Sequence, residues 1–364
     1  MQKIIENILN ETPGLKGREI AKKISTDHKS VNSFLHKHKD IFIQDDNYCW
    51  FLAVPPVQVL ELDAKNWITV DSFEDSLVQI GCLLSSNSPA VLVKIPKNCK
   101  IMLIASARLL ALLNQLVFNG KAVSVDFIDC ASIKHFLSRA GFFDHLDDRV
   151  NVIPSRPASA AKIYKGNSNA LVEFGAIDPK QENAELIRLL WQAFVEHSDS
   201  RYEIAAFTVF SELIGNISEH SDSQINGFAA LQKYGDNKKY RKHIQTVVSD
   251  SGRGIATTLR PSLKEHYPDL YRLYKEENVE SDAGLVITAL SKGEISRFGS
   301  GRGLGFKSSR TQAMKFDAKL FVRQERFSLN FNYKDGVLVD VERKLGIPRI
   351  LGSHLCFDFF VDPL

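Results

Sequence analysis

The sequence is poor in the features that mark secreted, membrane and disulfide-stabilised proteins. Its 364 residues include five cysteines, which form no CxxC pair and no histidine spacing suited to zinc: Cys49, Cys82, Cys99, Cys130 and Cys356. No apolar run approaches the roughly 20 residues that span a bilayer, and the first residues do not read as a signal peptide. We therefore expect reduced thiols, a cytoplasmic location and no membrane partner.

The chain also lacks a large charge excess, an internal repeat and a low-complexity tract. Its formal net charge is +3, which is too small to predict nucleic-acid binding for the chain as a whole. With 44% hydrophobic residues, a chain of this length can bury two or three ordinary cores. The composition thus predicts a protein of several globular domains.

Three short motifs in the C-terminal half contain the residues best suited to chemistry. Glu212, Asn216 and His220 recur at every fourth position along one face of a predicted helix. A β-branched run then ends in a second motif, formed by Asp250, Gly252, Gly254 and Ile255. The third motif precedes a helical pattern and contains Gly299, Gly301, Arg302, Gly303 and Leu304. Each motif alone is compatible with a solvated helix face or a plain turn, so the prediction depends on their conjunction.

In order, spacing and helix or strand context, these motifs resemble the N, G1 and G2 boxes of the GHKL ATPases, the superfamily of gyrases, Hsp-type chaperones, histidine kinases and MutL proteins. The resemblance implies a Bergerat-type α/β sandwich, a mixed sheet covered by helices, over residues 165–364 with a nucleotide lid at 256–298. Gly215 stands where many relatives have Asp. Arg302 stands where sensor kinases usually have an apolar residue. The sequence Gly-Arg-Gly-Leu at residues 301–304 is instead similar to that of the anti-sigma branch of serine kinases.

The resemblance also assigns roles to individual residues. Glu212 takes the position of the general base, and Asn216 that of the Mg²⁺ ligand. Asp250 takes the position of the residue that recognises adenine. Ser353 lies in a predicted closing strand and takes the position of the residue that contacts this acid. ATP and Mg²⁺ are the implied ligands, and the implied nucleotide site consists of Asn216, His220, Asp250, Gly252, Gly254, Ile255, Gly299, Gly301, Arg302, Gly303, Leu304 and Ser353.

Residues 1–55 form a smaller predicted domain that ends at a Pro-Pro pair. Helical patterns over residues 3–9, 15–24 and 27–38 precede a hairpin pattern over residues 41–52, and Asp27 is the expected N-cap of the third helix. Three helices and a hairpin resemble a winged helix-turn-helix domain.

In winged helix-turn-helix proteins the third helix enters the major groove of DNA. The resemblance therefore implies contacts to bases or phosphates by Lys29, Ser30, Asn32, Ser33 and His36. Many winged helices instead bind proteins, and Asp45 and Asp46 at the expected hairpin tip would repel phosphate. DNA and a protein both stay open as partners of this domain.

Between these regions, residues 62–155 alternate strands with helices. Strands are expected over residues 90–95 and 122–128, and helices over 105–116 and 132–140. This alternation resembles STAS domains, in which a GHKL kinase phosphorylates a serine at the start of the central helix. Ser106 lies near that place without the surrounding Asp-Ser-Ser-Gly pattern, so we interpret it as an ordinary helix residue in a module for packing or for binding a protein.

Together the patterns predict a multidomain α+β protein. The favoured function is that of an ATP-binding, Mg²⁺-dependent, ATP-hydrolysing regulatory protein, whose nucleotide state controls the arrangement of the lid and the N-terminal domains. An anti-sigma-type protein serine kinase and a DNA-binding regulator that uses ATP only as a ligand are the alternatives, and a homodimer stays open. A sensor histidine kinase is disfavoured, because no histidine begins the phosphoacceptor pattern of that class.

Overall fold

The computed structural model describes residues 1–53, 57–178, 183–198, 200–220, 222–235, 241–292, 317–335 and 337–361. They fall into two compact units, the first formed by Met1–Gln58 with Asn87–Pro89 and the second by Val59–Ser86 with Ala90–Leu364. Both the predicted middle domain and the predicted ATPase domain lie within the second unit. The mixture of helices and sheets agrees with the predicted α+β class.

The first unit contains the three helices and the hairpin that the sequence predicts. A three-stranded sheet of order β1-β3-β2 accompanies the helices; the elements are α1 (Gln2–Glu11), β1 (Leu15–Lys16), α2 (Gly17–Lys23), α3 (His28–Lys37), β2 (Phe42–Gln44) and β3 (Cys49–Leu52). Asp27 caps α3 as expected, since its carboxylate accepts a 2.9 Å hydrogen bond from the amide of Ser30. The core is small and is built around Trp50, Phe42 and the buried faces of the helices.

The second unit begins with a four-stranded sheet of order β4-β6-β8-β9, in which β6, β8 and β9 are parallel. The strands are β4 (Val57–Glu61), β6 (Ala90–Lys94), β8 (Ala122–Asp126) and β9 (Asn151–Ile153), with β5 (Trp67–Ile68) and β7 (Lys100–Ile101) forming a separate parallel pair. The helices of this part are α4 (Val70–Ile80), α5 (Leu103–Phe118), α6 (Ala131–Arg139), α7 (Phe142–His145) and α8 (Ala160–Tyr164). The predicted strands at 90–95 and 122–128 and helices at 105–116 and 132–140 are confirmed as β6, β8, α5 and α6.

The C-terminal part contains a five-stranded sheet of order β10-β11-β12-β14-β13. Its strands are β10 (Leu171–Ile177), β11 (Gly227–Tyr234), β12 (Lys242–Ser249), β13 (Asp317–Lys334) and β14 (Val337–Val361). All neighbouring pairs among these described strands are antiparallel, so the expectation of a mixed sheet is wrong for them. Short connections account for the β11–β12 and β13–β14 pairs, because a parallel pair needs a long crossover; the β10–β11 and β12–β14 pairs are antiparallel although helices lie between their strands in sequence.

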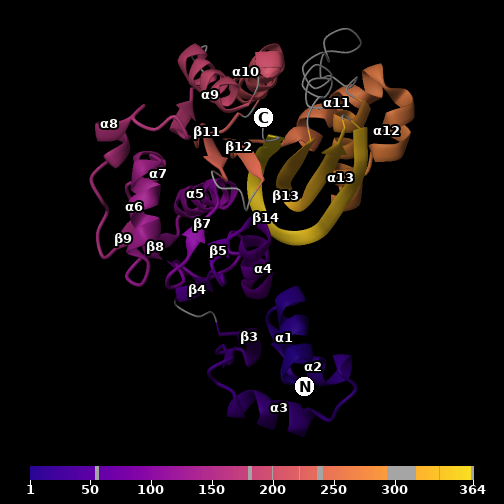
Figure 1. The fold of residues 1–364 in the computed structure, drawn as a ribbon. Helices are drawn as coiled ribbons and strands as arrows, with labels where there is room; N and C mark the ends of the chain where they lie inside the picture. Colours follow the sequence, from indigo (N-terminus) through magenta and orange to yellow (C-terminus); the bar gives the residue numbers. More distant parts are fainter. Residues whose placement is uncertain are drawn as a thin grey trace. The chain divides into compact units, whose positions relative to one another are not determined.

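The central strands of this antiparallel sheet are buried on both faces. Side chains of a strand alternate between faces, and Phe228 and Ala230 belong to one hydrophobic core while Ala229 and Leu231 belong to the other. Helices α9 (Ala184–His197) and α10 (Glu203–His220), joined through the 3₁₀ turn Ser200–Tyr202, cover one face, and α5 packs against the other (Figure 1). The two cores therefore share one sheet.

Helix α5 is the centre of the second unit. Every residue from Leu103 to Val117 is buried, because the helix lies between the parallel β6–β8 part and strands β11, β12 and β14 of the antiparallel sheet. Even so, no helix in the described ranges is both long and apolar enough to cross a membrane.

The segment that the resemblance assigns to the nucleotide lid folds as three helices, α11 (Ile255–His266), α12 (Pro268–Tyr274) and α13 (Val279–Lys292). Leu259, Leu263, Leu285 and Val286 are buried in the same core as strands β13 and β14, and Figure 1 shows these helices beside the long curved β13–β14 hairpin. Residues 255–292 thus belong to the packed body of the domain. The rest of the predicted lid, residues 293–298, lies outside the described residues.

Candidate nucleotide site

Asp250 follows directly after β12 and is buried, with 7% of its surface exposed. Its carboxylate Oδ1 accepts a 2.7 Å hydrogen bond from the amide of Gly252, and its own amide donates to the carbonyl of Ser353 at 2.9 Å. Burial raises the pKa of Asp250 to about 6, although the amides of Gly252 and Ser353 work in the opposite direction. No ion pair links this carboxylate to a cation among the described residues.

Two glycines allow the backbone to close around Asp250. Gly352 has φ +84°, and a Cβ there would lie 2.2 Å from the carbonyl oxygen of Asp250. Gly254 has φ +77°, and its Cβ would lie 2.6 Å from Nε2 of Gln324. A side chain at Gly352 would displace the Asp250 backbone and one at Gly254 would displace the Gln324 side chain, and both positions have a positive φ that favours glycine. Gln324 is itself buried and accepts a 3.1 Å hydrogen bond from the amide of Ile255, which fixes the start of α11.

Helix α10, which carries the first predicted motif, ends near the loop that carries the second. Ile217 of α10 packs beside Gly227, where a Cβ would lie 2.9 Å from Ile217 Cγ2 and 3.0 Å from the carbonyl oxygen of Ser249. Beyond the end of α10, Asp222 forms a 2.9 Å ion pair with Arg253 of the loop that follows Asp250. Helix α10 and the Asp250 loop are therefore neighbours although about 30 residues separate them in the sequence.

Helix α10 carries the remaining candidates of the first motif. The predicted helix is confirmed, and Glu212 and Asn216 are half-buried one turn apart on it. The helix also includes His220, whose side chain lies outside what the structure describes. The third motif, with Gly299, Gly301, Arg302, Gly303 and Leu304, falls outside the described residues as well.

Ser353 meets Asp250 through its backbone. It lies in β14, opposite the end of β12, where Ser249 pairs with His354. Its carbonyl accepts from the amide of Asp250, and its amide contributes to lowering the pKa of that carboxyl. The closing strand predicted from Gly352 onward is confirmed, and it forms the last two fifths of the longer β14, which has 25 residues.

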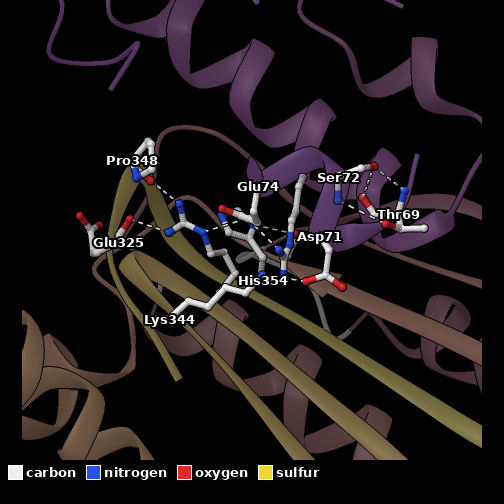
Figure 2. Close-up of polar contacts among 11 residues, drawn as sticks. Thr69, Asp71, Ser72, Glu74, Glu325, Lys344, Pro348 and His354 are labelled. Atoms are coloured by element: carbon white, nitrogen blue, oxygen red, sulfur yellow. Dashed lines mark hydrogen bonds and ion pairs between the residues drawn. The ribbon is translucent and has the colours of Figure 1, made fainter. Parts of the chain in front are cut away.

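A fully buried ionic cluster lies near the same end of the sheet (Figure 2). Glu74 of α4 accepts hydrogen bonds from Arg108 of α5 at 2.7 Å and from Arg323 of β13 at 3.1 Å. Arg323 also donates to the carbonyls of Glu325 and Pro348. This cluster ties α4 and α5 of the predicted middle domain to the β13–β14 hairpin.

His354 lies between this cluster and the Asp250 loop. Burial, reinforced by repulsion from Arg323 and Arg108, lowers the pKa of His354 to about 3, so the ring is neutral at ordinary pH. Its Nε2–H then donates to the carbonyl of Leu351 at 2.9 Å, and its Nδ1 accepts from the hydroxyl of Ser249 at 2.7 Å.

Sequence reasoning missed the polar residues of α4, α5 and β13 that surround the site. Arg108 and Gln115 stand in an otherwise apolar helix, and this is the signal that could have indicated buried partners. The partners of Gln115 are more than 100 positions away in sequence, and Glu74, the partner of Arg108, lies on a different helix, so no local pattern identifies them.

Ser106 is completely buried in α5, and its hydroxyl donates a 3.0 Å hydrogen bond to the carbonyl of Met102. This agrees with its interpretation as an ordinary helix residue. The five cysteines are all free, and no group of three potential metal ligands drawn from His, Cys, Asp and Glu gathers in the described part of the chain.

In the first unit, the five candidate DNA-contacting residues divide into two groups. Lys29, Ser30, Ser33 and His36 are exposed on α3, and Asn32 is partly buried. Asn32 bonds to His28 at 2.9 Å and lies so close to Gly17 that a Cβ there would be 1.9 Å from its Oδ1. The ring of His36 stacks edge-on against Trp50 with centroids 4.8 Å apart. Asn32 and His36 thus already have packing roles within the domain.

No protein-family model, no curated protein and no solved structure matches this chain.

Proposed function

We propose that the second unit binds ATP between α10 and the end of the antiparallel sheet and hydrolyses it with Mg²⁺. The observation that carries this proposal is the Asp250 carboxylate, which is buried, has no cationic partner in the described residues, and is held by the backbone of two neighbouring turns. Desolvating a carboxylate without a partner is costly, so such a group is a candidate for recognising a ligand. An exocyclic amine such as that of adenine is a suitable donor.

The residue types around Asp250 fit the other parts of the nucleotide. Glu212 and Asn216 lie one turn apart on α10, and α10 reaches the Asp250 loop through Ile217 and the Asp222–Arg253 ion pair. The amide oxygen of Asn216 is a hard donor that suits Mg²⁺. When bound, the ion would neutralise phosphate charge. Glu212 would orient the attacking water and accept its proton.

Calorimetric titration with ATP and Mg²⁺ tests the site through Asp250→Asn. This substitution keeps the shape of the side chain but replaces one acceptor oxygen with a donor, so either the bond from Gly252 or the bond from the base must be lost. We expect ATP binding to be lost, and a measured affinity equal to that of the wild type would contradict adenine recognition by Asp250.

Asp358→Asn is the matched control, because Asp358 is another buried acid of the same sheet, bonded to His243 and Gln245 at 2.6 and 2.9 Å. It should leave ATP affinity unchanged. Asn216→Ala, in contrast, should weaken binding mainly when Mg²⁺ is present, since it removes the proposed protein ligand of the ion.

We further propose that the nucleotide state controls the arrangement of the N-terminal domain. Control of a moving lid, which the resemblance also implies, has less support, because α11, α12 and α13 are packed in the core. The separation of the chain into two compact units supports this role, because interdomain arrangement can then change without unfolding either unit. Small-angle scattering of the wild type with and without ATP tests it; identical curves in both states would contradict it. An assay for transfer of the γ-phosphate to protein separates hydrolysis from serine kinase activity.

DNA binding by the first unit is a second candidate function. The exposed Lys29, Ser30 and Ser33 on one helix favour it, since hydroxyl and ammonium groups are common phosphate contacts. Asn32 supports it less, because its side chain is engaged within the domain, and His36 is exposed but contacts Trp50.

A further inference from the structure

Helix α5 contributes a buried side chain to the surroundings of Asp250. Gln115 is 0% exposed, and its Nε2 donates hydrogen bonds of 2.9 Å both to the hydroxyl of Ser251 and to the carbonyl of Leu351. Its Oε1 accepts a 2.8 Å bond from the amide of Leu351. Both amide hydrogens and the amide oxygen of this one side chain are thus used to join α5 to two backbone segments.

Those two segments are the ones that hold Asp250. Ser251 is the next residue after Asp250, and Leu351 lies just before Gly352 and Ser353, whose backbone meets Asp250. The carbonyl of Leu351 also accepts from His354. Loss of the Gln115 amide would release both sides of the turn at once, and it would leave the buried amide of Leu351 without its partner.

We infer that Gln115 is a positioning residue of the nucleotide site: it holds the Ser251 and Leu351 backbone segments so that the Asp250 carboxylate is pre-oriented for the base. The inference rests on the proposed function. It also gives the predicted middle domain a part in the site, because Gln115 belongs to α5 and not to any of the three motifs. A pre-oriented first contact needs a second layer of fixed side chains.

The neighbouring residue on α5 provides a matched control. Asn114 is also buried, its Nδ2 donates a 2.9 Å bond to the carbonyl of His145, and its Oδ1 accepts a 2.9 Å bond from the amide of Asp147. It therefore makes the same kinds of bond from the same helix, but toward α7 and the loop before β9. A general loss of packing would affect both amides alike.

The test compares Gln115→Met with Asn114→Leu, each of which replaces an amide with an apolar side chain of similar size. We expect Gln115→Met to raise the Kd and the KM for ATP about tenfold while kcat changes by less than about twofold, because Glu212 is untouched. Asn114→Leu should change the Kd by less than about twofold. The preference for ATP over GTP should fall only in Gln115→Met.

Ser251→Ala keeps the test valid if Gln115→Met does not fold, since Ser251 is only half-buried. It should raise the Kd about threefold. In the double variant with Gln115→Met, the Kd should rise by less than the product of the two single fold-changes, because both substitutions remove the same hydrogen bond. A rise in Kd equal to that product would mean that the Gln115–Ser251 bond has no role in binding.

The outcomes separate the inference from the proposed function. A wild type that binds no ATP overturns both. A wild type that binds ATP, together with an Asp250→Asn variant that does not and a Gln115→Met variant with unchanged affinity, overturns the inference alone. Equal weakening by Gln115→Met and Asn114→Leu overturns it too, because the effect would then come from packing of α5. Hydrogen exchange of the Ser251–Ile255 peptide should become faster in Gln115→Met and not in Asn114→Leu.

Discussion

Two buried carboxylates of the second unit, Glu74 and Asp250, have opposite surroundings. Glu74 lies between the guanidinium groups of Arg108 and Arg323, so its charge is matched inside the protein. Asp250 has only backbone amides as described partners, and burial raises its pKa to about 6. A buried acid that is paired with cations can stabilise the fold. A buried acid without them lowers stability, and such a group is expected where a ligand supplies the missing partner.

The largest effect is expected from breaking the matched cluster. Glu74→Ala leaves two buried guanidinium groups without their carboxylate, and it should lower the free energy of unfolding of the second unit by roughly 3–5 kcal/mol. Urea titration followed by circular dichroism measures the change.

Asp71→Ala is the control, since Asp71 lies on the same helix and forms an exposed 2.8 Å ion pair with Lys344 (Figure 2). Surface pairs of this kind are worth about 0–1 kcal/mol. If Glu74→Ala were no more destabilising than Asp71→Ala, the cluster would not hold α4 and α5 to the hairpin.

The second prediction moves from fold to chemistry. Glu212→Ala should lower ATP turnover at least about a hundredfold, which corresponds to about 2.7 kcal/mol in activation free energy, while ATP affinity stays nearly unchanged or rises slightly. In the proposed site the acid, one turn before Asn216, would act beside the phosphates rather than hold the base. Phosphate release in purified protein is the measurement.

Glu203→Ala tests the specificity of that result, because Glu203 is an exposed acid at the start of the same helix. It should keep wild-type turnover. Wild-type hydrolysis by a contaminant-free Glu212→Ala preparation would place the general base elsewhere.

Much of the geometry behind these predictions follows from local sequence pattern. Neighbouring residues are enough to predict the helix that bears Glu212, the strand that leads to Asp250 and the turn that follows. The signals are a helical period, a β-branched run and closely spaced glycines. The parallel strands β6 and β8 and helix α5 could be predicted for the same reason.

The rest could not be predicted, because it depends on contacts between distant residues. Gly346 and Pro348 interrupt the strand pattern of β14, and strand propensity argues against both. The long hairpin exists because α13 packs against it and Arg323 binds the carbonyl of Pro348. Likewise the contact between Gln115 and Leu351 joins residues far apart, and the sequence shows only that a polar side chain stands in an apolar helix.

The third prediction concerns the pH dependence of stability that Asp250 and His354 cause. The raised pKa of Asp250 means that the folded state holds its proton more tightly than the unfolded state, so this group's contribution to stability is lost as pH rises from about 4 to 6. The lowered pKa of His354, about 3, has the opposite sign, because the unfolded state then binds more protons as pH falls from 6.5. In the wild type the two effects oppose each other.

Asp250→Asn removes only the first of these effects. At pH 7–8 it should raise the free energy of unfolding by about 2 kcal/mol, and stability should fall more steeply than in the wild type between pH 6.5 and 4. ATP affinity of the wild type should fall as pH drops through about 6, since the protonated acid accepts less well. A variant that is less stable than the wild type at pH 8 would show that desolvation does not dominate at Asp250.

The smallest effect is expected in the first unit, where no acid is buried among the residues that the structure describes. If α3 contacts DNA phosphates, the affinity of the full chain for duplex DNA should fall with salt, and Lys29→Ala should reduce the slope of log K against log salt by about one. Lys3→Ala, at an exposed lysine of α1, should keep the wild-type slope.

Because Asn32 is held against Gly17 and His36 against Trp50, their replacement should lower the stability of the domain more than it changes DNA sequence preference. An absence of any mobility shift at low salt would favour a protein as the partner of this domain.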